Sequence, residues 1–129
     1  MGVHDRTRES RSAWWLATAL LASVVLAAGL VAQSKRDVTV SAKKYGFEPA
    51  EIRVQQDDLV NVVFTAEDIA HSFTISDDHY RIDRRAEPGK PASFRFRADK
   101  PGTFEIRCTL TIDDRCLRDM HAKLIVVGK

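Results

Sequence analysis

The sequence predicts an all-β domain, a sandwich or a barrel, behind one long apolar segment near the N-terminus. In residues 34–129, apolar residues alternate with polar residues over short runs, and no run keeps a helical period. Turn sequences rich in Gly and Pro separate these runs: GFEP at 46–49, PGKP at 88–91 and KPG at 100–102. About seven short strands in one small domain are typical of a β-sandwich or a β-barrel.

The apolar segment covers residues 13–32, AWWLATALLASVVLAAGLVA, and no charged residue lies between Arg11 and Lys35. A helix of this length rises about 30 Å, which is the thickness of the hydrocarbon core of a bilayer. Trp14 and Trp15 stand at its start, where aromatic rings favour the membrane interface. The segment therefore predicts one transmembrane helix.

This pattern divides the chain into a short cytoplasmic N-terminus at 1–12, a transmembrane anchor or signal segment at 13–33, and a domain at 34–129. As an anchor, the segment predicts a single-pass protein of the cell membrane, with the C-terminal domain in the periplasm or outside the cell. The alternative is a cleaved signal peptide, with three Arg before the apolar run and small residues at 27–29 as a cleavage site. Cleavage would release the domain into the periplasm, so both alternatives export it.

Seven segments of the domain are predicted to be strands, because apolar side chains recur at every second position or form a short apolar run. Residues 34–37 are expected to be a short tether before the first of them. The predicted strands are DVTV at 37–40, EIRV at 51–54, LVNVVFT at 59–65, AHSFTIS at 70–76, SFRFR at 93–97, TFEIRC at 103–108 and KLIVV at 123–127.

Charge and motif content exclude several classes of function. Residues 34–129 carry 17 Lys and Arg against 16 Asp and Glu, so the domain lacks the basic surface that nucleic-acid binding requires. The sequence holds no Gly-rich phosphate loop, no C-x-x-C, no H-E-x-x-H and no G-x-S-x-G. We therefore expect neither an enzyme nor a binder of nucleic acid or of a small-molecule substrate.

Strand alternation places one His and one Cys on the inner face of the domain. Phe104 shares its strand face with Cys108, and Phe73 shares its strand face with His71. Both His71 and Cys108 stand near the end of a predicted strand. They could therefore meet at one end of a sandwich, although a lone inward His is more often a hydrogen-bonded core residue.

Further donor side chains follow Cys108 closely. Cys116, Met120 and His121 all lie within the next 13 residues, and thiolate, thioether and imidazole together suit copper, while zinc is also compatible. The phase of the last strand points Met120 inward and His121 outward. The alternative for the two Cys is a disulfide, because paired Cys in an oxidising compartment are more often bridged than ligands. Met120 is equally compatible with core packing.

The sequence resembles the cupredoxin family, in particular the copper-binding domain of cytochrome c oxidase subunit II and its small single-domain periplasmic relatives. This resemblance covers nearly all of residues 38–127 and implies a Greek-key β-sandwich over 34–129. The matching segments are YGFEPAEIRV at 45–54, AHSF at 70–73, EPGKPASFRF at 87–96, KPGTFEIRC at 100–108 and MHAKLIVV at 120–127.

The resemblance also implies a copper site. His71, Cys108 and Met120 correspond to ligands of the family. The binuclear sites of the family carry a Cys-x3-Cys-x3-His-x2-Met run, but here Ile112 stands at the second Cys, and Cys116 stands at the second His. We therefore expect one copper ion rather than a binuclear centre, with Cys116 or His121 as the remaining ligand.

Two functions of different classes follow. The first is a membrane-tethered, extracytoplasmic copper protein for electron transfer or copper carriage, with a redox partner such as a cytochrome or an oxidase. An oxidase-associated subunit is a variant of this hypothesis. The second is a metal-free interaction module of the same fold, stapled by a Cys108–Cys116 disulfide.

Overall fold

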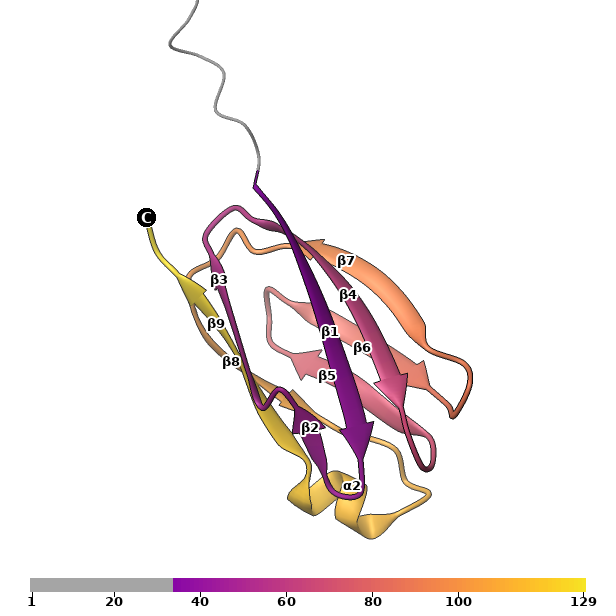
Figure 1. The fold of residues 1–129 in the computed structure, drawn as a ribbon. Helices are drawn as coiled ribbons and strands as arrows, with labels where there is room; N and C mark the ends of the chain where they lie inside the picture. The colour runs from indigo at the N-terminus through magenta and orange to yellow at the C-terminus, as the bar shows by residue number, and fades with distance from the viewer. Residues whose placement is uncertain (1–33) are drawn as a thin grey trace, which may run out of the picture. The chain divides into compact units, whose positions relative to one another are not determined.

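Nine strands and one short helix run through residues 34–129, the part of the chain that the computed structural model describes (Figure 1). The seven predicted strand segments all fall on observed strands. The elements are β1 (Lys35–Lys43), β2 (Gly46–Glu48), β3 (Glu51–Gln55), β4 (Leu59–Ala66), β5 (His71–Ser76), β6 (Arg81–Ala86), β7 (Ala92–Arg97), β8 (Gly102–Arg107), α2 (Asp114–Asp119) and β9 (His121–Val127).

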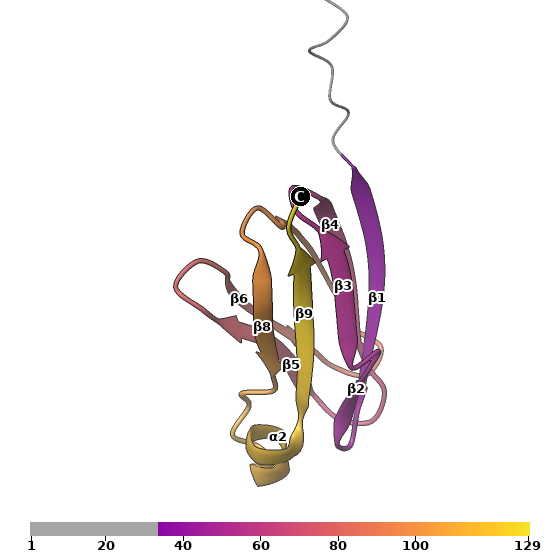
Figure 2. The same ribbon diagram turned by 90° about the vertical axis from the view of Figure 1, so that its left-hand side faces the viewer.

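The strands form two sheets that pack face to face (Figure 2). One sheet has the order β2-β1-β4-β7, and the other has the order β3-β9-β8-β5-β6. Pairs β1–β4 and β3–β9 are parallel, whereas the other pairs are antiparallel. The chain passes repeatedly from one sheet to the other, which confirms the predicted all-β sandwich.

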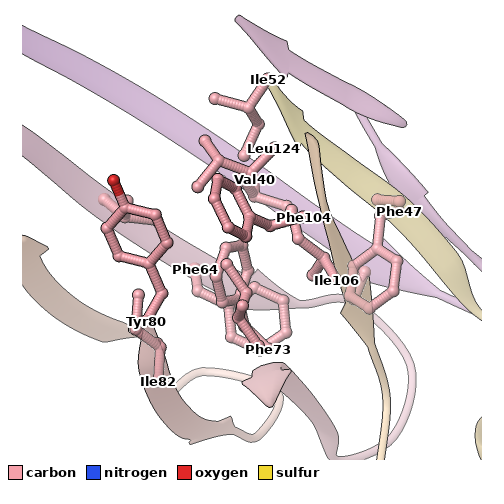
Figure 3. Close-up of a cluster of buried hydrophobic side chains, with 14 of the residues drawn as sticks. Val40, Phe47, Ile52, Phe64, Phe73, Tyr80, Ile82, Phe104, Ile106 and Leu124 are labelled. Carbon is pink, nitrogen blue, oxygen red and sulfur yellow. The ribbon is translucent and has the colours of Figure 1, made fainter. Parts of the chain in front are cut away.

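Aromatic side chains from both sheets fill the space between them (Figure 3). The ring of Phe64 on β4 meets the ring of Phe73 on β5 with centroids 5.8 Å apart, and Phe73 meets Phe94 on β7 at 5.3 Å. Burial of each such side chain stabilises the fold by about 1.5–3 kcal/mol. The alternation that predicted the strands is therefore also the pattern that builds the core.

Two strands and one helix escape prediction from the sequence. Residues 46–48, expected to be part of a turn, form the short strand β2, and β1 begins at Lys35 inside the expected tether. Strand β6 buries only Ile82 and Ala86, because it lies at the edge of its sheet and turns its charged side chains to solvent. Helix α2, with six residues, is too short to show a helical period.

The predicted anchor or signal segment at 13–33 lies outside the described residues. Among residues 34–129, no helix combines the length and the apolar character needed to cross a membrane.

The topology brings the predicted metal-binding residues to one end of the sandwich. Strand β5 begins with His71 where β1 and β4 end, and β8 ends at Arg107, directly before Cys108. Helix α2 covers the same end, which we call the site end (Figures 1 and 2). The far end, where β1 begins, holds the β5–β6 turn with Tyr80 and the turn before β8 with Lys100.

Candidate metal centre

His71 is the first residue of β5 and is completely buried. Its Nε2 lies 2.7 Å from Oδ1 of Asp68, in the turn before β5. Its Nδ1 is buried and has no hydrogen-bond partner among the described residues. Buried polar atoms are nearly always hydrogen-bonded, so an unpartnered ring nitrogen in a core requires an explanation.

Asp68 is held by two backbone groups besides His71. The backbone N–H of Lys44 donates to Oδ2 at 2.7 Å, and that of Ile69 donates to Oδ1 at 2.8 Å. Burial acts to raise the pKa of Asp68, but the hydrogen bonds from Lys44, His71 and Ile69 outweigh it and lower the pKa to about 2. Asp68 is therefore a carboxylate at neutral pH, and it accepts two backbone hydrogen bonds besides its contact with Nε2 of His71.

Cys108 and Cys116 form a disulfide, with Cα atoms 5.2 Å apart. Both residues are buried, and Cys116 is the one buried residue of α2. The backbone N–H of Ser72, next to His71 in the chain, points to Sγ of Cys108 at 3.4 Å. The disulfide therefore lies beside the start of β5, and of the two roles predicted for these Cys the structure shows the disulfide.

Met120 is the C-cap residue that follows α2, and it is completely buried, as the strand phase predicts. It belongs to the same buried cluster as Cys108 and Cys116. Its thioether therefore lies in the apolar interior, where it packs as part of the core.

His121, by contrast, is exposed and bonded away from the core. Its Nδ1 lies 2.7 Å from Oε1 of Glu105, and its Nε2 lies 2.7 Å from the carbonyl oxygen of Arg118 in α2. Both ring nitrogens are engaged with oxygen acceptors. The outward orientation predicted for His121 is confirmed, and the structure does not bring it together with the buried residues.

Several side chains that the sequence did not single out hold α2 over the disulfide. Asp113 caps the helix by accepting from the backbone N–H of Arg115 at 2.9 Å, and the hydroxyl of Tyr45 donates to Asp113 at 3.0 Å. The Arg115 guanidinium lies 3.9 Å from the centroid of the Tyr45 ring. Arg107 donates to the carbonyl oxygen of Leu117 at 2.9 Å. These contacts close the site end around buried sulfur atoms.

The Tyr45–Asp113 contact also changes the acid–base properties of its partners. The hydrogen bond to Asp113 raises the pKa of Tyr45 above its ordinary value. The backbone N–H of Arg115 lowers the pKa of Asp113. Both shifts favour the arrangement seen here, with a neutral phenol donating to a carboxylate.

A sequence profile of the cupredoxin-like domain matches residues 12–126. The chain belongs to the cupredoxin-like domain family. Among curated proteins, none matches this sequence.

Solved structures show the same cupredoxin fold at low sequence identity. The periplasmic domain of subunit II of cytochrome oxidase from Bradyrhizobium japonicum is 18% identical, with 78% of this chain and 89% of that chain covered and a TM-score of 0.61. Subunit II of cytochrome c oxidase in a mixed disulfide with a thioredoxin-like protein is 18% identical, with 78% and 87% covered and a TM-score of 0.60. Auracyanin A, a blue copper protein from Chloroflexus aurantiacus, is 15% identical, with 72% and 99% covered and a TM-score of 0.61. These identities establish the fold alone.

The donor types at the site end are ones that suit copper, but only with the Cys108–Cys116 disulfide reduced. No three His, Cys, Asp or Glu side chains gather into a metal-binding group within residues 34–129, and the sulfurs of Cys108 and Cys116 are bonded to each other. In the dithiol state, Cys108 and Cys116 would be buried thiols in the same core as the Met120 thioether, and Nδ1 of His71 is buried without a partner among the described residues. Imidazole, thiolate and thioether are the donors that suit copper.

Proposed function

We propose that this chain is a membrane-tethered, extracytoplasmic cupredoxin-like protein that binds one copper ion when Cys108 and Cys116 are reduced, for electron transfer or copper carriage. The observation that carries the proposal is the buried Nδ1 of His71, which has no partner among the described residues. When bound, copper would supply a one-electron redox couple.

The unpartnered nitrogen is costly in the metal-free protein. A buried acceptor without a hydrogen bond lowers stability by about 1–3 kcal/mol. A metal bound at Nδ1 would remove that cost and would also use the thiolate of Cys108, whose sulfur lies beside the backbone of Ser72. His71 and Cys108 are therefore the first two ligands that we assign, and the buried Met120 is the third.

Cys116 is a better candidate than His121 for the fourth ligand. Cys116 is buried and its sulfur already contacts that of Cys108. His121 would have to give up its contacts with Glu105 and the carbonyl oxygen of Arg118 and turn from solvent into the core. A site of two thiolates, one thioether and one imidazole is soft and favours copper over harder ions.

We propose that a dithiol partner of the thioredoxin class reduces the disulfide in the cell. In such an exchange the partner's two thiols become a disulfide, and Cys108 and Cys116 become two thiols, with two electrons and two protons transferred. The mixed disulfide between a thioredoxin-like protein and subunit II of cytochrome c oxidase supports a partner of this kind. The predicted anchor at 13–33 would hold the protein at the membrane, within reach of a cytochrome or an oxidase.

A copper titration tests the proposal. The full chain in detergent is reduced, freed of metal and titrated with Cu(I) and Cu(II) without oxygen, and visible absorption and electron paramagnetic resonance are recorded. We expect one equivalent to bind, with a thiolate-to-copper band for Cu(II). Cys116→Ser should weaken binding strongly, whereas His121→Ala should not. No binding by the reduced protein would contradict the proposal.

A second candidate function is a metal-free interaction module of the same fold. The disulfide favours it, together with the lack of a three-residue metal-binding group in residues 34–129 in that state. Here the disulfide only staples the loop that carries α2. In that case Cys116→Ser lowers the melting temperature, and copper changes neither variant nor wild type.

A further inference from the structure

We propose that Asp68 is a positioning residue for His71: by accepting the hydrogen of Nε2, it keeps the lone pair on the buried Nδ1 and fixes the orientation of the ring. This inference deepens the proposed function, since it concerns the imidazole that would hold the copper.

The first step concerns the hydrogen of the imidazole. Asp68 already accepts the backbone N–H groups of Lys44 and Ile69, so its side chain acts as an acceptor toward its neighbours. The third group within hydrogen-bond distance is Nε2 of His71, 2.7 Å from Oδ1. An acceptor at that distance requires a hydrogen on Nε2.

The second step concerns the other ring nitrogen. Nδ1 has no partner among the described residues, and the side chain of His71 is 0% exposed. A hydrogen on Nδ1 would be an unsatisfied donor in the core and would also take from Nε2 the hydrogen that Asp68 accepts. The tautomer with hydrogen on Nε2 and a lone pair on Nδ1 therefore satisfies the larger number of groups.

The third step concerns the orientation of the ring. Asp68 is fixed by backbone groups from two places, the β1–β2 turn at Lys44 and its own turn at Ile69. The ring of His71 is thus tied to the end of the first sheet, although it begins a strand of the second. A metal-binding His usually needs such a partner on its other nitrogen, and loss of that partner lowers metal affinity by roughly 10- to 100-fold.

The chain supplies a matched control in a second Asp–His pair at the far end. Nε2 of His79 lies 2.6 Å from Oδ1 of Asp99, with side-chain exposures of 41% and 47%. This pair has nearly the same contact distance but is open to water. Removing Asp99 should therefore test the loss of a carboxylate without affecting His71.

The tautomer is tested in the full chain in detergent, labelled with ¹⁵N, free of metal and with the disulfide intact. Long-range ¹H–¹⁵N spectra at neutral pH distinguish the two tautomers and the doubly protonated ring, and the His71 signals are assigned by their loss in His71→Gln. We expect hydrogen on Nε2 only. Asp68→Ala should shift His71 toward a mixture, Asp68→Asn should keep the tautomer through its amide oxygen, and Asp99→Asn should leave it unchanged. Hydrogen on Nδ1 of wild-type His71 would overturn the inference.

Copper affinity of the reduced protein gives the second readout. Asp68→Ala should bind copper roughly 10- to 100-fold more weakly, and Asp99→Asn should bind as wild type does. The positioning role of Asp68 would be overturned if Asp68→Ala bound copper as tightly as wild type and kept the same tautomer of His71. If the wild type shows the expected tautomer but binds no copper, the proposed function fails, while the effect of Asp68 on the ring is still supported.

Discussion

The two ends of the sandwich each hold an Asp–His pair, and burial makes them different. At the site end, His71 is fully buried against Asp68, and its second ring nitrogen has no partner among the described residues. At the far end, His79 and Asp99 are both exposed. The comparison teaches that a short Asp–His contact alone does not make a candidate site, whereas a buried ring nitrogen without a hydrogen-bond partner does.

At the far end, the buried hydroxyl of Tyr80 has hydrogen-bond partners, unlike Nδ1 of His71. Tyr80 is 5% exposed, and its hydroxyl accepts from the backbone N–H of Lys100 at 2.8 Å and donates to the Lys100 carbonyl oxygen at 2.9 Å. Its ring meets the ring of Phe104 edge to face, with centroids 4.6 Å apart. Among the described residues, no buried side-chain nitrogen or oxygen at the far end lacks a hydrogen-bond partner.

Of the variants considered, truncation of Tyr80 at the far end should change the free energy of unfolding most, while leaving His71 at the site end unaffected. Tyr80→Ala is expected to lower the free energy of unfolding by about 3–5 kcal/mol, because it leaves a cavity in the core. Tyr80→Phe should lower it by about 1–3 kcal/mol through the unpaired backbone of Lys100. Urea unfolding followed by circular dichroism measures both. The tautomer of His71 should not change in Tyr80→Phe, and a change would contradict the independence of the two ends.

Removal of the disulfide should cause the next largest loss of stability. Cys116→Ser opens a loop whose ends are 8 residues apart, which should lower the free energy of unfolding by about 2–3 kcal/mol. For a domain of this size that corresponds to a fall of roughly 10–20 °C in melting temperature. His121→Ala is the control on the same segment and should have a clearly smaller effect. Equal melting temperatures for Cys116→Ser and wild type would show that the bridge does not staple the site end.

Acid should weaken the site end through Asp68. Its pKa in the folded protein is about 2, below its ordinary value of 3.8. The charged carboxylate therefore stabilises the fold fully only at pH values above its ordinary pKa. That contribution, about 1–2 kcal/mol for a partly exposed group, is lost as the pH falls from about 4 to about 2. The difference in stability between wild type and Asp68→Asn should therefore be widest at neutral pH and close toward pH 2. Asp99→Asn should show a smaller difference, and a constant gap for Asp68→Asn would contradict this assignment.

Strand alternation was sufficient to predict the core and part of the candidate site. The period of two that buries Phe104 in β8 also buries Cys108 directly after it, as predicted, whereas β5 buries Ser72 and Thr74 in addition to the predicted His71 and Phe73. Met120 was predicted to be buried from the last strand for the same reason. The edge strand β6 could not be predicted, because at a sheet edge charged side chains on both faces can reach water.

The remaining features depend on contacts between distant segments or on chemistry that the sequence does not encode. Asp68 lies only three residues before His71, but the backbone N–H of Lys44, which helps to fix its carboxylate, lies 24 residues earlier in the chain. The choice between a disulfide and two thiols depends on the redox state of the compartment as well as on the 5.2 Å separation of the Cα atoms. The spacing of Cys108 and Cys116 alone left both alternatives open.

The smallest expected effect concerns access to the buried disulfide. Tyr45→Phe removes the hydroxyl that donates to Asp113 but keeps the ring beneath Arg115. Because Cys108 and Cys116 are buried, a reductant can reach them only when the segment carrying α2 moves away. Loss of one hydrogen bond of about 0.5–1.5 kcal/mol should raise the population of that open state, and hence the rate of reduction by a small dithiol, roughly 2- to 10-fold.

The rate is measured by trapping free thiols with an alkylating reagent. Tyr80→Phe destabilises the far end instead, so it should leave this rate unchanged if opening is local. If Tyr80→Phe accelerates reduction more than Tyr45→Phe does, the disulfide is reached only by global unfolding, and α2 is not a separately opening part of the site end.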